Sequence, residues 1–224
     1  MTDPRKKLQL GVLVSGSGTN LQAILDAAGQ DRIDVEVRVV ISNRPRARGL
    51  ERARAAGVPT VVVSHKKFDG REPFEEALIA ALGEHGVEWV ALAGFMRVLT
   101  PRFLRAFPER VINIHPALLP AFPGTHGQRQ ALEYGVKVSG CTIHFVDEGT
   151  DTGPIIAQAV VPVLDDDDEE TLAARILEQE HRIYPWVLQL LAEGRVVRDG
   201  RRVKVMDARP EIFAHINPPP HERP

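Results

Sequence analysis

The chain has 224 residues, of which 43% are hydrophobic and 26% are charged, as in ordinary globular proteins. Its formal net charge of −2 provides no basic excess for neutralising a nucleic-acid backbone. No apolar run approaches the roughly 20 residues of a membrane span, and the first residues are too polar for a signal peptide. The single cysteine, Cys141, excludes an intrachain disulfide framework. We therefore expect a cytoplasmic protein with no nucleic-acid or membrane partner.

Strand-like and helix-like segments alternate through the first 115 residues. Apolar and β-branched runs predict strands at 8–14, 35–41, 60–63, 87–93 and 110–115. Helical spacing and glycine or proline stop signals predict helices at 21–28, 47–56, 72–82 and 101–107. This alternation is typical of the α/β class, with a mostly parallel, Rossmann-like sheet flanked by helices.

The pattern changes in the second half of the chain. A helix is predicted at 127–134, followed by two strands at 139–146 and 155–163 that we expect to pair antiparallel, so the sheet becomes mixed. The acidic run 165–170 is expected to open a helix at 171–192, because acidic residues favour a helix N-terminus. A hairpin at 195–205 follows. We predict one domain over residues 1–206 and a partly disordered C-terminal tail over 207–224.

A glycine-rich segment, residues 15–20, joins the first strand to the first helix. Backbone N–H groups at such a turn, together with the helix N-terminus, form an anion site. The dinucleotide fingerprint is excluded because Leu21 replaces its third glycine, and the nucleotide-triphosphate loop is excluded because no lysine follows. The segment suits a single phosphate group. A tight turn without a ligand is an equally good interpretation.

Asn113 and His115 end the fifth predicted strand, and strand alternation places both side chains on one side. Pro116 keeps His115 extended. An amide N–H and an imidazolium N–H aimed at one point can stabilise a developing oxyanion, and histidine can also move a proton. Asp151, in the loop 147–154, is the candidate carboxylate that orients the imidazole.

Three other interpretations of these residues stay open. A strand-end Asn and His often only satisfy backbone groups of nearby loops. His115, His144 and Asp151 could instead supply metal ligands, although the closely spaced histidine pair of metallohydrolases is missing. Cys141 is a weaker nucleophile candidate, because a mid-strand position usually holds a small buried thiol.

Four motifs in fixed order make the sequence recognisable: SGSGTNLQ at 15–22, AGFMRVL at 93–99, NIHPALLP at 113–120 and DTGP at 151–154. They closely resemble the folate-dependent phosphoribosylglycinamide formyltransferase family, as do residues 122–126 and 179–185. The resemblance extends from about residue 8 to residue 198. Ala117 stands where the family usually has Ser, and Thr152 where Gly is common. We expect these two departures to affect local loop geometry and not the chemistry.

The resemblance implies the formyltransferase fold and transfer of a formyl group from 10-formyltetrahydrofolate to the amine of 5-phosphoribosylglycinamide (glycinamide ribonucleotide) in purine biosynthesis. It implies direct attack of the amine, without a metal, at a catalytic set of Asn113, His115 and Asp151. The implied phosphate and ribose ligands are Gly18, Thr19, Asn20 and Glu180. The implied folate site is lined by Met96, Arg97, Val98, Leu99 and Asn113, with Arg71 near the folate carboxylates. His144 matches a further position near the site.

Three other functions are compared with this one. The related formyltetrahydrofolate hydrolases add an N-terminal regulatory domain, for which a first motif strand at residue 8 leaves no room. Methionyl-tRNA formyltransferases add a C-terminal domain and need a basic surface, which the length and net charge disfavour. A non-catalytic folate or phosphosugar binding protein would not require the three catalytic residues. The sequence leaves open whether the chain forms a homodimer.

Overall fold

The computed structural model describes residues 7–208, so residues 209–224 of the predicted tail lie outside the described part. One sheet contains the strands β1 (Leu8–Val14), β2 (Val35–Ser42), β3 (Thr60–Val62), β4 (Trp89–Leu92), β5 (Val111–His115), β6 (Val138–Phe145) and β7 (Ile155–Pro162). The helices are α1 (Thr19–Gly29), α2 (Arg48–Ala55), α3 (Arg71–Glu84), α4 (Pro101–Ala106), α5 (Gly127–Tyr134) and α6 (Glu169–Ala192). The strands β8 (Val196–Asp199) and β9 (Arg202–Val205) form a separate hairpin.

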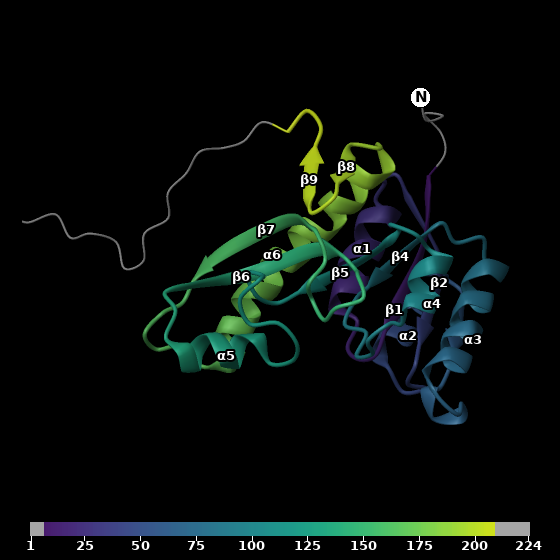
Figure 1. The fold of residues 1–224 in the computed structure, drawn as a ribbon, viewed down its shortest axis with the longest axis horizontal. Helices are drawn as coiled ribbons and strands as arrows, with labels where there is room; N and C mark the ends of the chain where they lie inside the picture. The colour runs from purple at the N-terminus through teal and green to yellow at the C-terminus, as the bar shows by residue number, and fades with distance from the viewer. Residues whose placement is uncertain (1–6, 209–224) are drawn as a thin grey trace, which may run out of the picture.

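The seven-stranded sheet has the order β3-β2-β1-β4-β5-β6-β7. The first five strands are parallel, whereas β6 pairs antiparallel with both β5 and β7. The strand order reverses between β1 and β4, which is where ligands bind in sheets of this kind. The carboxyl ends of β1, β4 and β5 therefore lie side by side, as the sequence predicts for residues 15–20, 94–99 and 113–116 (Figure 1).

Helices cover both faces of the parallel part of the sheet (Figure 1). Alternate residues of β1 point to opposite faces: Leu10 and Val12 pack with α1, α2 and α6, whereas Leu13 packs with α3 and α4. The hydroxyl of Tyr184 on α6 is fully buried in the first of these cores and donates to the carbonyl of Leu92 at 3.0 Å. This bond ties α6 to the carboxyl end of β4.

Each predicted element is present, with ends that differ from the prediction by two residues at most. The strands 139–146 and 155–163 do pair antiparallel, so the mixed α/β sheet is confirmed. The acidic run opens α6 as expected, because the Asp168 carboxylate accepts from the Thr171 N–H at 2.8 Å in a capping box. One short 3₁₀ turn, His65–Lys67, was not predicted.

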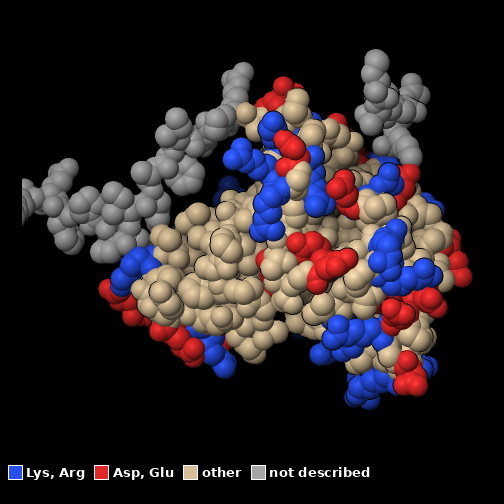
Figure 2. Space-filling model, viewed as in Figure 1, with Lys and Arg blue, Asp and Glu red and all other residues tan. Residues whose placement is uncertain are grey.

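The exposed charges are mixed in sign. Figure 2 shows basic and acidic side chains interspersed over the part of the surface that contains α3 and α4. Among residues 7–208, no helix is long and apolar enough to cross a membrane. The expected lack of a nucleic-acid partner stays a prediction.

Replacing Tyr184 with Phe tests the link between α6 and β4. We expect Tyr184→Phe to lower the free energy of unfolding by about 1–2 kcal/mol, because the buried Leu92 carbonyl loses its side-chain donor. Urea denaturation measures this change. Tyr134→Phe is the control, because Tyr134 is 79% exposed and its replacement should change stability little. Equal stabilities of the two variants would contradict the assignment.

Candidate active site

The pairing of β5 with β6 brings three polar side chains together. Asn113 and His115 lie two residues apart on β5, so their side chains share one face of the sheet. In the antiparallel register, Asn113 lies directly opposite His144 of β6. Directly opposite residues point to the same face, and Asn113 Nδ2 lies 3.2 Å from His144 Nε2.

The loop between β6 and β7 folds back over this face and adds Asp151. The loop packs tightly against the end of β6 at Gly153. A Cβ there would lie 1.7 Å from the Phe145 carbonyl oxygen, so only glycine fits. Asp151 itself has φ 53°, in the left-handed region that Asp and Asn tolerate better than most residues. Backbone geometry therefore directs this carboxylate toward β5.

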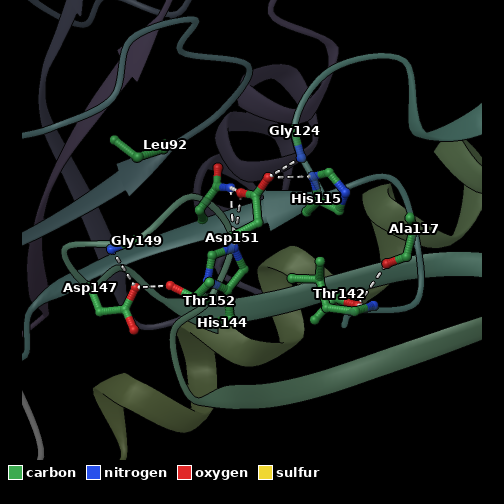
Figure 3. Close-up of polar contacts among 12 residues, drawn as sticks. Leu92, His115, Ala117, Gly124, Thr142, His144, Asp147, Gly149, Asp151 and Thr152 are labelled. Carbon is green, nitrogen blue, oxygen red and sulfur yellow. Dashed lines mark hydrogen bonds and ion pairs between the residues drawn. The ribbon is translucent and has the colours of Figure 1, made fainter. Parts of the chain in front are cut away.

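The Asp151 carboxylate lies at the centre of the polar cluster (Figure 3). Oδ2 lies 3.3 Å from His115 Nδ1 and accepts from the Gly124 N–H at 2.8 Å. Oδ1 accepts from Asn113 Nδ2 at 3.4 Å and lies 3.6 Å from His144 Nε2. The predicted set of Asn113, His115 and Asp151 thus lies together, with His144 as a fourth member.

Burial and hydrogen bonding act in opposite directions on Asp151. Burial raises the pKa of this carboxyl, but the contact with His144, the Gly124 N–H and the nearby His115 together lower it, and the pKa is below the ordinary value. Asp151 is therefore a carboxylate at neutral pH. Its side chain keeps 13% exposure, so it borders the cavity above it.

The His115 imidazole is held at both nitrogens. Nε2 donates to the Phe122 carbonyl oxygen at 2.8 Å, and Nδ1 faces Asp151. Burial lowers the pKa of His115, and this outweighs the opposing effects of the Asp151 charge and the Phe122 carbonyl. Burial thus works against the imidazolium expected from the sequence. Because Nε2 donates to the Phe122 carbonyl, the neutral ring can gain a proton only at Nδ1, beside the Asp151 carboxylate.

His144 is nearly fully buried, and its surroundings indicate that one of its ring nitrogens, Nδ1, carries a proton. Nδ1 lies 2.8 Å from the Phe145 carbonyl oxygen, which can only accept, so Nδ1 holds the proton. Nε2 lies 3.2 Å from the Asn113 amide nitrogen and 3.6 Å from Asp151 Oδ1, so it contacts both of these groups. His144 therefore orients the Asn113 amide.

A cavity of about 550 Å³ lies above the cluster. Asn113, His115, His144 and Asp151 line it together with the predicted segment Met96, Arg97, Val98 and Leu99. Arg71, the first residue of α3, is exposed and does not line this cavity. The structure thus brings the apolar segment and the polar cluster to one cavity, and the role of Arg71 stays a prediction.

A second cavity, of about 240 Å³, lies at the glycine-rich segment. It is lined by the residues predicted to bind phosphate and ribose, Gly18, Thr19, Asn20 and Glu180, and it shares Gly94 and Met96 with the larger cavity. Their binding role stays a prediction. Gly18 has φ 70°, and a Cβ there would lie 2.6 Å from Gly49 Cα, so glycine is required. The sequence prediction missed Arg44, which follows β2 and adds a cation to this lining.

Glu180 and Asn20 join α6 to the glycine-rich segment. Asn20 Nδ2 donates to Glu180 Oε2 at 2.7 Å, and the carboxylate is 6% exposed. Burial raises the pKa of Glu180, against the lowering effect of the Asn20 hydrogen bond. Asn20 Oδ1 is buried and has no hydrogen-bond partner among the described residues. That oxygen is an acceptor available to a ligand hydroxyl.

The other interpretations of the polar residues can now be compared with the geometry. Cys141 is buried in β6, and burial raises the pKa of its thiol to about 12, which opposes a role as nucleophile. Within residues 7–208, no three His, Cys, Asp or Glu side chains form a group that could hold a metal ion. The absence of a metal stays a prediction.

The two departures from the family pattern have local partners. The Ala117 carbonyl accepts from the Thr142 hydroxyl at 2.7 Å, and that hydroxyl accepts from the Leu119 N–H at 3.0 Å. The Thr152 hydroxyl donates to Asp147 Oδ1 at 2.6 Å. These three bonds stabilise the loops next to the cluster, and Figure 3 shows those that Ala117 and Thr152 make.

Comparison with known proteins decides the family. The model of the formyl transferase family matches residues 8–188. The chain belongs to this family. The matched range includes every residue that lines the two cavities, and it ends before the hairpin of β8 and β9.

Two kinds of protein are found among the curated relatives of this formyl transferase. Phosphoribosylglycinamide formyltransferase of Escherichia coli is 47% identical over 84% of this chain and 89% of the relative. The enzyme of the same name from Mycobacterium tuberculosis is 47% identical over 90% of this chain and 96% of the relative. The trifunctional purine biosynthetic protein of Drosophila melanogaster is 50% identical, but the chain spans only 14% of its length.

Solved structures of formyl transferases show the same fold. Glycinamide ribonucleotide transformylase 1 of Symbiobacterium toebii has a TM-score of 0.89 and 55% identity, covering 92% of this chain and 96% of that one. A formyltetrahydrofolate deformylase from Pseudomonas syringae has a TM-score of 0.85 and 30% identity, covering 92% of this chain and 68% of that one. The fold is thus shared by proteins named for transfer and for deformylation.

Removing the Asp151 charge tests the electrostatics of the cluster. The charge of Asp151 raises the pKa of His115 against burial, so we expect Asp151→Asn to lower that pKa further. Asn also tolerates the left-handed backbone at this position. An NMR titration of the imidazole C–H signals measures the change. Glu148→Gln, which changes an exposed residue of the same loop, is the control. An unchanged or raised His115 pKa in Asp151→Asn would contradict the assigned effect of the Asp151 charge.

Proposed function

We propose that this chain transfers the formyl group of 10-formyltetrahydrofolate to the amine of 5-phosphoribosylglycinamide, as part of purine biosynthesis in the cytoplasm. The observation that supports this most directly is the position of the cluster. Asn113, His115 and Asp151 border a large cavity that shares two lining residues with a smaller anion-binding one. Two substrates bound side by side could therefore react directly. The names of the full-length bacterial relatives agree with this activity.

The smaller cavity suits the phosphate and ribose of the acceptor. The glycine-rich segment and the N-terminus of α1 provide backbone N–H groups, and Arg44 provides a cation. The unpartnered Asn20 Oδ1 and the Glu180 carboxylate are acceptors for ribose hydroxyls. The larger cavity suits the folate, because the exposed side chains of Met96 and Val98 offer apolar contact beside the polar cluster.

The catalytic step needs a donor to the oxyanion that develops as the amine adds to the formyl carbon. The contact of Asn113 Nδ2 with Asp151 is long, at 3.4 Å, so a substrate oxygen can replace it with little loss. One such donor lowers the barrier by about 3–4 kcal/mol. His115 Nδ1 takes the proton of the attacking amine and returns it to the leaving nitrogen, and Asp151 stabilises the imidazolium formed between these steps.

The alternative function is hydrolysis of 10-formyltetrahydrofolate, in which water replaces the amine. The similarity to a deformylase at 30% identity supports testing this alternative. A spectroscopic assay of folate turnover, with and without 5-phosphoribosylglycinamide, separates the two. We expect turnover only when the amine is present. Turnover at the same rate without it would favour the hydrolase, and binding of both molecules without turnover would favour a non-catalytic protein.

Variants of the cluster test the assigned catalytic roles. We expect His115→Ala and Asp151→Asn each to lower kcat by about 10²–10⁴-fold, because proton transfer or its electrostatic support is lost. Binding of 5-phosphoribosylglycinamide, measured by calorimetry, should persist because neither residue lines the smaller cavity. Glu148→Gln is the matched control and should retain normal kcat. A near-normal kcat in either cluster variant would rule out its assigned role.

Variants of the smaller cavity test the phosphate site. We expect Arg44→Gln and Thr19→Val to raise the KM for 5-phosphoribosylglycinamide by about tenfold, the loss of one charged or polar contact. The KM for the folate should change less than twofold. Arg46→Gln is the control, because Arg46 is exposed and does not line either cavity. Equal increases in both KM values would argue against a phosphate site here.

A further inference from the structure

Glu75 is a buried carboxylate that lines neither cavity. It lies on α3 and is 1% exposed. No Lys or Arg within residues 7–208 forms an ion pair with it. Burying a carboxylate costs free energy unless hydrogen bonds compensate for the lost water. The partners of Glu75 therefore indicate why a carboxylate is present among the apolar residues of α3.

Both oxygens of Glu75 contact one residue, Thr100. The Thr100 N–H donates to Oε1 at 2.8 Å, and the Thr100 hydroxyl donates to Oε2. Thr100 is the N-cap of α4, yet its side chain makes no capping bond within α4. In a capping box a glutamate of the same helix accepts from the N-cap N–H. Here α3 supplies that glutamate, so the carboxylate sets the position at which α4 begins.

Thr100 directly follows the segment 96–99 that lines the larger cavity. Met96 and Val98 are 59% and 47% exposed, whereas the flanking Phe95 and Leu99 are buried. At the other end of the segment, the Met96 N–H donates to the buried Ser15 hydroxyl at 2.9 Å. The segment is thus held at both ends, and the exposed Met96 and Val98 side chains between these contacts line the cavity.

We propose that Glu75 is a positioning residue for the folate side of the cavity, acting through Thr100 on the segment 96–99. This inference rests on the proposed function, in which the segment contacts the folate. An apolar residue at position 75 would suit the buried apolar residues of α3 and α4, such as Leu78 and Phe103, and would need no hydrogen-bond partners. The Glu75 carboxylate, unlike an apolar side chain, accepts two hydrogen bonds from Thr100 and so fixes the position of that residue.

The test compares the KM values of Glu75 variants. Glu75→Leu keeps the apolar volume and removes both acceptors, and we expect at least a tenfold higher KM for 10-formyltetrahydrofolate. The KM for 5-phosphoribosylglycinamide should change less than twofold, because Met96 is the only residue of the segment that lines the smaller cavity and its N–H is held by Ser15, not by Thr100. Glu75→Gln should restore most of the folate KM. Its amide oxygen can accept from the Thr100 N–H and its NH₂ group can donate to the Thr100 hydroxyl.

Two further variants separate this role from a general loss of helix packing. Glu76→Gln is the matched control, because exposed Glu76 also joins α3 to α4, through Arg102 at 3.4 Å, and should leave both KM values unchanged. Thr100→Val removes the hydroxyl but keeps the N–H bond, and should raise the folate KM about threefold. If Glu75→Leu does not fold, Thr100→Val decides the question: an unchanged folate KM overturns the proposal.

The outcomes distinguish this proposal from the proposed function. A wild-type protein that does not transfer the formyl group overturns the proposed function. A wild-type protein that does transfer it, with a folded Glu75→Leu variant of unchanged folate KM, overturns only the positioning role. Equal increases in both KM values, or no recovery in Glu75→Gln, also overturn that role.

Discussion

The arrangement of the whole site depends on one carboxylate placed against two buried imidazoles and an amide. Asp151 belongs to a loop, whereas His115, His144 and Asn113 belong to two paired strands, so the loop must return over the sheet for them to meet. The return leaves no room for a side chain at Gly153. Strand register fixes three members of the cluster, and loop backbone fixes the fourth.

The reversal of strand order explains why the two cavities adjoin. The connections after β1 and β4 leave the sheet at neighbouring positions, and the polar residues of β5 follow next to them. Gly94 and Met96, just after β4, line both cavities. Direct transfer between two molecules gains most when both are held close and aligned, because the entropy of bringing them together is lost on binding and not in the reaction. The sheet topology places the segments that line the two cavities next to each other.

Sequence patterns predicted the elements well because periodicity is a local property. Strand alternation was also sufficient to place Asn113 and His115 on one face. The opposition of Asn113 and His144 was beyond such reasoning, because it depends on the register between β5 and β6, which no single segment encodes. Arg44 was missed for a similar reason: it follows β2, outside the glycine-rich segment, and only the fold brings it to that cavity. The role of Glu75 depends on contacts between two helices that sequence spacing does not reveal.

The electrostatics of His115 follow from the same placement. Burial alone would favour the neutral ring, and the Asp151 charge limits that effect without reversing it. A ring that is neutral in the free protein can accept a proton, and a carboxylate 3.3 Å away stabilises the cation once it forms. Because Nε2 donates to the Phe122 carbonyl, the ring can gain and lose its second proton only at Nδ1. The geometry thus favours proton movement in both directions at one atom, which a transfer between two nitrogen atoms requires.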